Sequence, residues 1–81
     1  MRSKMQITPR SFNELAVRLQ RERKRQGLSR DQAAAVCNVS PSFIRDAEVH
    51  PERCTLERLT LLTNGLGLSL TLTGWQDTEQ P

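Results

Sequence analysis

Residues 27–48, with the sequence GLSRDQAAAVCNVSPSFIRDAE, decide the fold of this chain. Ser29 stands near the start of this stretch, and a serine hydroxyl there can accept a backbone N–H from the first turn of a helix. Small apolar residues then recur at helical spacing as far as Cys37. Asn38 follows, and asparagine is one of the few residues besides glycine that tolerates a positive φ. We therefore expect a short helix over residues 30–37 that ends in a sharp turn.

A second helix start follows this turn. Ser40 is again a suitable N-cap, and Pro41 fits the first helical position, where no backbone N–H is needed. Ile44 and Ala47 have the spacing of an inner face, and Glu48 stands near the end of this helix. Two short helices joined by a tight turn form a helix-turn-helix unit, so the stretch predicts one.

The preceding segment predicts another helix. Its residues 11–14, SFNE, have the form of a capping box, in which Ser11 caps the helix and Glu14 reaches back to the Ser11 N–H. Thr8 is an earlier, competing start. We expect the helix to run to about Gln26, and its buried side to consist of Leu15, Ala16 and Leu19.

One basic residue of this first helix differs from its neighbours. A run of cations such as this one usually forms a solvated face. Arg23, however, lies four residues before Gly27, on the side that faces the helix-turn-helix unit, where Glu48 should also lie. We expect a partly buried ion pair between Arg23 and Glu48 that ties the first helix to the third. A phosphate contact by Arg23 is the alternative.

The chain after Glu48 begins with an aperiodic loop and then becomes helical again. Thr55 is the next N-cap. Gly65 inside this fourth helix costs about 1 kcal/mol relative to alanine, and Gly67 is a natural stop. The apolar stripe of the helix is expected to consist of Leu56, Leu59, Leu62 and Leu66.

Residues 68–73 change period and alternate strictly between leucine and a hydroxyl residue, which indicates a half-buried strand. A lone strand leaves its backbone groups unpaired. A second copy of the same strand across a two-fold axis would pair them. The side chains that would face the core or the partner are Leu68, Leu70 and Leu72.

Composition limits the function classes. The chain has 81 residues, of which 36% are apolar and 4% aromatic, so its aliphatic core is thin and dimerisation would add burial. A net charge of +3 favours a polyanionic partner. The two cysteines, Cys37 and Cys54, lack redox or zinc spacing and are expected to be free thiols in a reducing cytoplasm. With one histidine and no nucleophile–base set, phosphate loop or membrane span, we expect no enzyme, metal or cofactor.

We divide the chain into four parts. Residues 1–10 would be a flexible basic arm that could touch phosphates through Arg2, Lys4 and Arg10, and residues 11–67 the helical domain. Residues 68–74 would be the dimerisation strand, and residues 75–81, which begin with Trp75, a flexible tail.

The sequences at residues 27–48 and 55–70 (TLERLTLLTNGLGLSL) resemble the Cro/C1-type, XRE-like helix-turn-helix family. The strand that follows is similar to the HipB-type antitoxin branch, whose dimers share an intermolecular β-lid. The resemblance implies an all-α, phage-repressor-like domain of four to five helices with one C-terminal strand in a two-stranded lid. It also implies a homodimer that binds operator DNA, represses its own operon and binds a HipA-like kinase toxin.

The resemblance also indicates where DNA would bind. Family members often have Gln at the position of Arg30, and Gln, Arg or Lys at the positions of Pro41 and Ser42. Asp46 takes the position of a polar base reader, and could accept from cytosine N4. The candidate DNA contacts are Ser29 and Arg30 for phosphates, Ser40 and Ser42 for phosphates or base edges, Phe43 for a thymine methyl, and Arg45 and Asp46 for base edges.

Three alternatives stay open at this point. Arg45 could instead contact a phosphate from the flank of the helix, or form an ion pair with Asp46 or Glu48. Phe43 could instead pack against the second helix. The whole chain could be a protein-interaction module that neutralises a toxin and binds DNA weakly or nonspecifically, which Pro41 and Asp46 favour because neither is a long donor on the reading helix.

Overall fold

The computed structural model describes residues 4–74 and contains only helices among its regular elements in that range. Residues 1–3 and 75–81, with the expectations placed on Arg2 and Trp75, lie outside it. The elements are α1 (Phe12–Arg25), α2 (Arg30–Cys37), α3 (Pro41–Ala47), the 3-10 helix η1 (Pro51–Arg53) and α4 (Leu56–Gly65). The expected all-helical architecture with a helix-turn-helix unit is confirmed.

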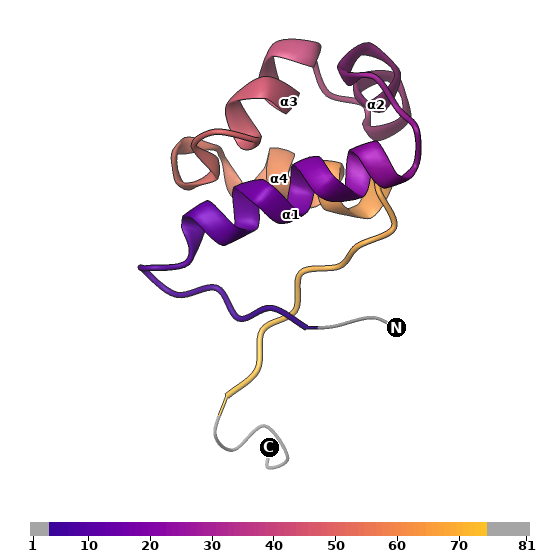
Figure 1. Cartoon of the computed structure of the whole chain (residues 1–81). Helices are drawn as coiled ribbons and strands as arrows, with labels where there is room; N and C mark the ends of the chain where they lie inside the picture. Colours follow the sequence, from indigo (N-terminus) through magenta and orange to yellow (C-terminus); the bar gives the residue numbers. More distant parts are fainter. Residues whose placement is uncertain (1–3, 75–81) are drawn as a thin grey trace.

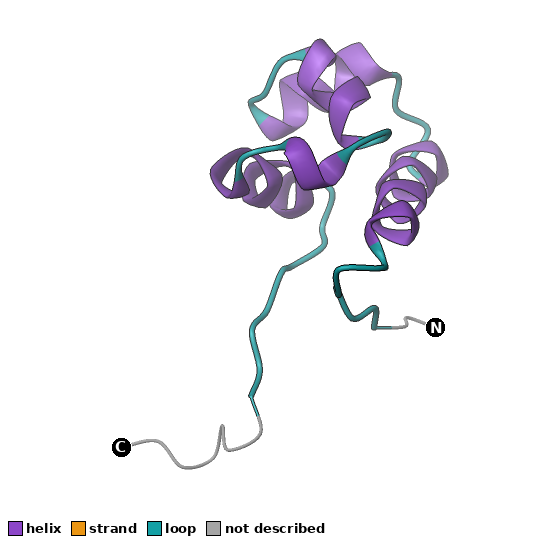
Figure 2. Cartoon of the chain, turned by 90° about the vertical axis from the view of Figure 1, so that its left-hand side faces the viewer, coloured by secondary structure: helices purple, strands orange, loops and turns teal. Residues whose placement is uncertain are grey.

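The helices form one body. In Figure 1, α1 crosses in front of α4, and α2 and α3 lie above both. Helix α2 packs against α3 and α4, while η1 contacts α1 and α3. Figure 2 shows the chain after α4 leaving this body as an extended segment. None of the described helices is long and apolar enough to cross a membrane.

Three of the helices begin at the N-caps that the sequence predicts. The Ser29 hydroxyl accepts the Gln32 N–H at 3.1 Å, and the Gln32 side chain accepts the Ser29 N–H at 2.8 Å, which completes a capping box. Ser40 and Thr55 cap α3 and α4 in the same way through one backbone N–H each. Asn38 ends α2 with φ of 61°, so the sharp turn lies where it was expected.

The expected capping box at the start of α1 is wrong. Ser11 precedes the helix, but its hydroxyl makes no bond to the first turn. It accepts the Thr8 N–H at 2.7 Å and lies within hydrogen-bond distance of the Gln6 carbonyl. Ser11 is buried, and these local hydrogen bonds to the preceding segment direct its hydroxyl away from the helix and from Glu14. The competing start at Thr8 is also wrong, because α1 begins at Phe12.

The core is small and aliphatic apart from one ring. Leu56, expected in the buried stripe of α4, is 69% exposed, whereas Leu62 and Leu66 are buried. At 3.6 residues per turn, Leu56 points about 120° away from Leu62, so both cannot face the same core. The core consists of Leu15, Leu19, Ala33, Ala34, Cys37, Phe43, Ile44, Ala47, Leu62 and Leu66.

Gly65 lets α4 approach α2 closely. A Cβ atom on Gly65 would lie 2.8 Å from the Cα of Cys37 and would also overlap its side chain. The Cys37 thiol donates to the Leu62 carbonyl at 3.5 Å in the same contact. A glycine is therefore required here by packing, although it is unfavourable for the helix itself.

Gly65→Ala is expected to destabilise the domain by up to about 2 kcal/mol. Overpacking a filled core usually costs about 1–3 kcal/mol, and the better helix propensity of alanine offsets about 1 kcal/mol of that cost. Urea unfolding measures the difference, and Asn64→Ala on the exposed side of the same helix is the matched control. A Gly65→Ala variant more stable than the parent would contradict the close contact.

The chain after α4 is extended. Gly67 has φ of 81°, and the next amide, of Leu68, donates to the Thr63 carbonyl at 2.8 Å, which closes the end of the helix. Leu68 packs against the core, Leu70 is half-buried, and Leu72 is 99% exposed. Residues 68–74 pair with no other described segment of this single chain, so the two-stranded lid stays a prediction about two chains.

Candidate nucleic-acid interface

The start of α2 presents polar groups to solvent. Ser29 and Arg30 are exposed, and the capping box uses the Ser29 hydroxyl and the Gln32 side chain. Helix N-termini carry free N–H groups and a partial positive charge, which favour an anion. Arg30, the first residue of the helix, adds a full positive charge at this end.

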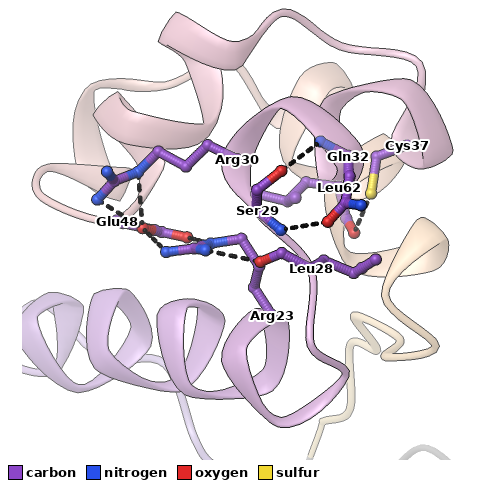
Figure 3. A network of polar contacts seen from close by, with 8 residues as sticks. All are labelled: Arg23, Leu28, Ser29, Arg30, Gln32, Cys37, Glu48 and Leu62. Carbon is purple, nitrogen blue, oxygen red and sulfur yellow. Dashed lines mark hydrogen bonds and ion pairs between the residues drawn. The ribbon is translucent and has the colours of Figure 1, made fainter.

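A buried carboxylate joins this end of α2 to α1 and α3. Glu48 accepts the Arg23 Nε–H at 2.6 Å and its Nη2–H at 3.1 Å, so the expected ion pair is present and bidentate. Arg23 also donates to the Leu28 carbonyl at 2.9 Å. Arg30 contacts the same carboxylate at 3.2 Å, an interaction that the sequence did not suggest. Figure 3 shows the two guanidinium groups on either side of Glu48.

The start of α3 offers only short side chains. Ser40 and Ser42 are exposed, and their hydroxyl oxygens lie 3.2 Å apart in a mutual hydrogen bond. Ser40 also caps the helix by accepting the Phe43 N–H at 3.0 Å. The ring of Phe43 belongs to the core and is 7% exposed, so the structure supports its packing role and leaves little of it for a thymine methyl.

The middle of α3 turns its charged residues outward. Ile44 and Ala47 are fully buried, and Arg45 and Asp46 between them are exposed. Their opposite charges stand on the same surface, but no ion pair joins them in the described residues. Both side chains are therefore accessible from solvent, as the helical spacing predicts.

A groove of about 580 Å³ runs between the end of α3, η1 and the start of α4. Arg45, Arg53 and Arg58 line it, and within residues 4–74 none of these three guanidinium groups has a hydrogen bond or ion pair. Asp46 supplies the one carboxylate among the lining residues. A second, smaller hollow brings Arg58 together with Ser40 at the start of α3.

Sequence reasoning missed Arg53 and Arg58. Arg53 stands in a stretch without periodicity, and Arg58 lies in the first turn of α4, outside the helix-turn-helix unit. The signal that could have found Arg58 is its place three residues after the N-cap Thr55, at a helix end that faces the turn after α3. Arg45, Arg53 and Arg58 form a patch of positive charge, and we call these three residues the groove arginines.

Neither cysteine has the properties of a reactive thiol. Both are free, as expected, and burial raises the pKa of the Cys37 thiol. Burial also raises the pKa of Cys54, and the negative charges of Asp46 and Glu52 add to that effect. A thiol with a raised pKa stays protonated at neutral pH and is a poor nucleophile.

Glu22 partly neutralises the positive charge at the C-terminal end of α1, the helix to which it belongs. Hydrogen bonds from Arg25 and then Gln26 lower the pKa of Glu22 to about 2. Gln26 also donates to the Leu66 carbonyl at 2.8 Å, which ties this end of α1 to the end of α4. Arg21 and Lys24 remain exposed on the same helix, while Lys4 and Arg10 are exposed in the segment before it.

Comparison with known families identifies the fold. Residues 19–72 match the sequence model of the helix-turn-helix family HTH_3. The chain belongs to the helix-turn-helix family. The match includes α2, α3 and α4, and therefore the groove arginines and Glu48, and it confirms the family that the sequence resembles. No curated protein sequence matches the chain.

Three solved structures share this helix-turn-helix fold. A chain of the HipA-HipB-O2-O3 complex is 23% identical, with a TM-score of 0.74, over 90% of this chain and 100% of that chain. A chain of a complex between a HipB variant and an O2 20mer is 24% identical, with a TM-score of 0.75, over 91% and 100%. A structure described as MDT Protein is 23% identical, with a TM-score of 0.74, over 90% and 100%. At these identities the likeness concerns the fold.

Proposed function

We propose that this protein is a sequence-specific DNA-binding transcriptional repressor that acts as a homodimer. The observation that carries the proposal is the patch of groove arginines, which have no partner within residues 4–74, next to the exposed face of α3 in a helix-turn-helix domain. A helix of this kind enters the major groove, and the flanking positive groups meet phosphates. The protein would be a regulator without enzymatic activity or a cofactor, acting in the cytoplasm at the nucleoid.

We assign the contacts by chemistry. Arg45 and Asp46, exposed on α3, would read base edges, with Arg45 bidentate to guanine O6 and N7 and Asp46 accepting from cytosine N4. Phosphates would meet hydroxyls, backbone N–H groups and guanidinium groups around the starts of α2, α3 and α4. The residues proposed for phosphates are Ser29, Arg30, Ser40, Ser42, Arg53 and Arg58, and Lys4 and Arg10 could add contacts from the N-terminal arm.

We further propose that the repressor is the antitoxin of a HipA-like kinase toxin and controls its own operon. The support is the fold shared with chains of the HipA-HipB-O2-O3 complex and of the HipB variant with the O2 20mer. In the homodimer, residues 68–74 would form the shared lid through Leu68, Leu70 and Leu72, followed by the tail at residues 75–81.

One observation favours a second candidate function, a toxin-neutralising module that binds DNA weakly or nonspecifically. The start of α3 has no long side chain for reading bases, because it consists of Ser40, Pro41 and Ser42. Pro41 has no donor, and the hydroxyl groups of Ser40 and Ser42 are hydrogen-bonded to each other. Arg45 then decides between the two functions, because it is the one long donor on α3.

We expect Arg45→Ala and Arg58→Ala to weaken DNA binding in different ways. Arg45→Ala should lose about 1–3 kcal/mol of discrimination between the operator and single-base variants. Arg58→Ala should weaken all duplexes evenly and reduce the slope of log K against log salt by about one unit. Fluorescence anisotropy titrations of both variants at several salt concentrations measure the two effects.

Lys24→Ala, at an exposed residue of α1 that does not line the groove, is the charge-matched control and should change neither quantity much. If Arg45→Ala lowers the affinity for every duplex equally, Arg45 contacts a phosphate and not a base. This result would favour the toxin-neutralising module. No measurable binding by the parent protein to any duplex would refute the DNA-binding function itself.

A further inference from the structure

Glu48 serves two arginines that have different surroundings. The side chain of Glu48 is 2% exposed and that of Arg23 is 8% exposed, whereas the side chain of Arg30 is 43% exposed. The carboxylate therefore holds one guanidinium inside the protein and a second one at the surface. Figure 3 shows that Arg30 reaches this carboxylate from the start of α2.

The geometry leaves Arg30 free to bind another acceptor. Its Nε and Nη2 atoms lie 3.3 and 3.2 Å from the same Glu48 oxygen, Oε1. An arginine has five N–H donors in a planar fork, so those directed away from Glu48 remain available. Two guanidinium groups share one carboxylate, which leaves the cluster with one net positive charge at a helix N-terminus.

An arginine that is already ordered binds an anion more tightly than a mobile one. A long exposed side chain loses rotamer freedom when it contacts a phosphate, and this loss reduces affinity. Glu48 has already restricted Arg30 in the free protein. The groove arginines lack such a partner among the described residues and would lose their freedom only on binding.

We propose that Glu48 is a positioning residue for nucleic-acid binding, because its buried carboxylate holds the exposed Arg30 guanidinium ready for a DNA phosphate. This inference rests on the proposed DNA-binding function. It assigns an acidic side chain a favourable role in binding a polyanion, although its charge alone would repel the ligand.

The test is a double-mutant cycle on a fluorescein-labelled random 20-bp duplex at fixed salt, since a phosphate contact needs no operator. Glu48→Gln retains the shape and one acceptor for Arg23, and circular dichroism at low temperature confirms that each variant is folded. We expect Glu48→Gln to weaken binding about five-fold. In the Arg30→Met background, the same change should leave binding unchanged or tighten it, because only the loss of a negative charge remains.

Asp31→Asn is the matched control for charge. Asp31 is an exposed acid in the first turn of α2, so this variant removes one negative charge at the same end of the helix. It should leave binding unchanged or tighten it, opposite to Glu48→Gln. Equal losses from Glu48→Gln in both Arg30 backgrounds, or no loss in either, would overturn the positioning role.

A measurement on the unmodified protein covers the case in which Glu48→Gln does not fold. In ¹⁵N NMR, the Arg30 Nε–H should show the heteronuclear NOE of an ordered group, and Arg45 and Arg58 should show that of mobile ones. An Arg30 signal as mobile as that of Arg45 would refute the positioning. If Arg30 is ordered but the parent protein binds no duplex, the proposed function fails instead, and the DNA role of Glu48 fails with it.

Discussion

Glu48→Ala is expected to lower the free energy of unfolding by about 3–5 kcal/mol, the usual result of removing one partner from a buried ion pair. Arg23 would keep its positive charge at a site where its side chain is 8% exposed. Among residues 4–74, the Leu28 carbonyl, at 2.9 Å, would then be its one acceptor. In a domain of this size each kcal/mol shifts the melting temperature by about 4–8 °C, so the loss should exceed about 12 °C.

Thermal unfolding by circular dichroism measures this loss, with Glu52→Ala as the control for an exposed glutamate. The double variant Arg23→Met with Glu48→Leu separates two causes. If the cost of Glu48→Ala comes from an uncompensated charge, replacing both partners by apolar residues should restore most of the stability. A double variant as unstable as the single one would mean that the pair itself holds α1 to α3.

The N-caps of three helices were predictable from the sequence, because an N-cap requires only a hydroxyl side chain and a backbone N–H of the following turn. Ser29, Ser40 and Thr55 all cap as expected, and Asn38 takes a positive φ. Ser11 shows the limit of this reasoning. The same residue type stands at the same position, but local hydrogen bonds to the preceding segment redirect its hydroxyl.

Features that depend on two elements meeting in space were harder to predict. Gly65 looked like a weak point in a helix until the contact with Cys37 showed why a side chain does not fit. Arg53 and Arg58 join Arg45 because η1 packs against α3 and the start of α4 lines the same groove. The Arg23–Glu48 pair was predictable because helical spacing placed Arg23 on the side of α1 that faces the end of α3. The contact between Arg30 and Glu48 could not be predicted in this way.

Leu72→Glu is expected to weaken the proposed homodimer by at least about 100-fold in Kd. Leu72 is 99% exposed in the single chain, and in the proposed lid the partner would bury it. Full burial of a leucine contributes about 1.5–3 kcal/mol, and a two-fold interface loses that contribution twice. Each 1.4 kcal/mol corresponds to a tenfold change in Kd.

Thr71→Glu is the matched control for this prediction. Neighbouring residues of a strand point to opposite faces, so the same charge at position 71 should face solvent and leave the dimer intact. Sedimentation equilibrium of the two variants distinguishes a lost apolar contact from a general effect of charge on the segment. Equal weakening by both variants would argue against a strand with one buried face.

Removing residues 69–81 tests the lid as a whole while preserving the helical body. This truncation keeps Leu68, whose amide closes α4 and whose side chain packs against the core, so the remaining domain should stay folded. We expect a monomer in light scattering, and weaker DNA binding, because two half-sites are no longer held by one protein. An unchanged dimer mass would place the interface on the helices. The exposed Leu72 would then be free for another partner, which in the proposed function is the toxin.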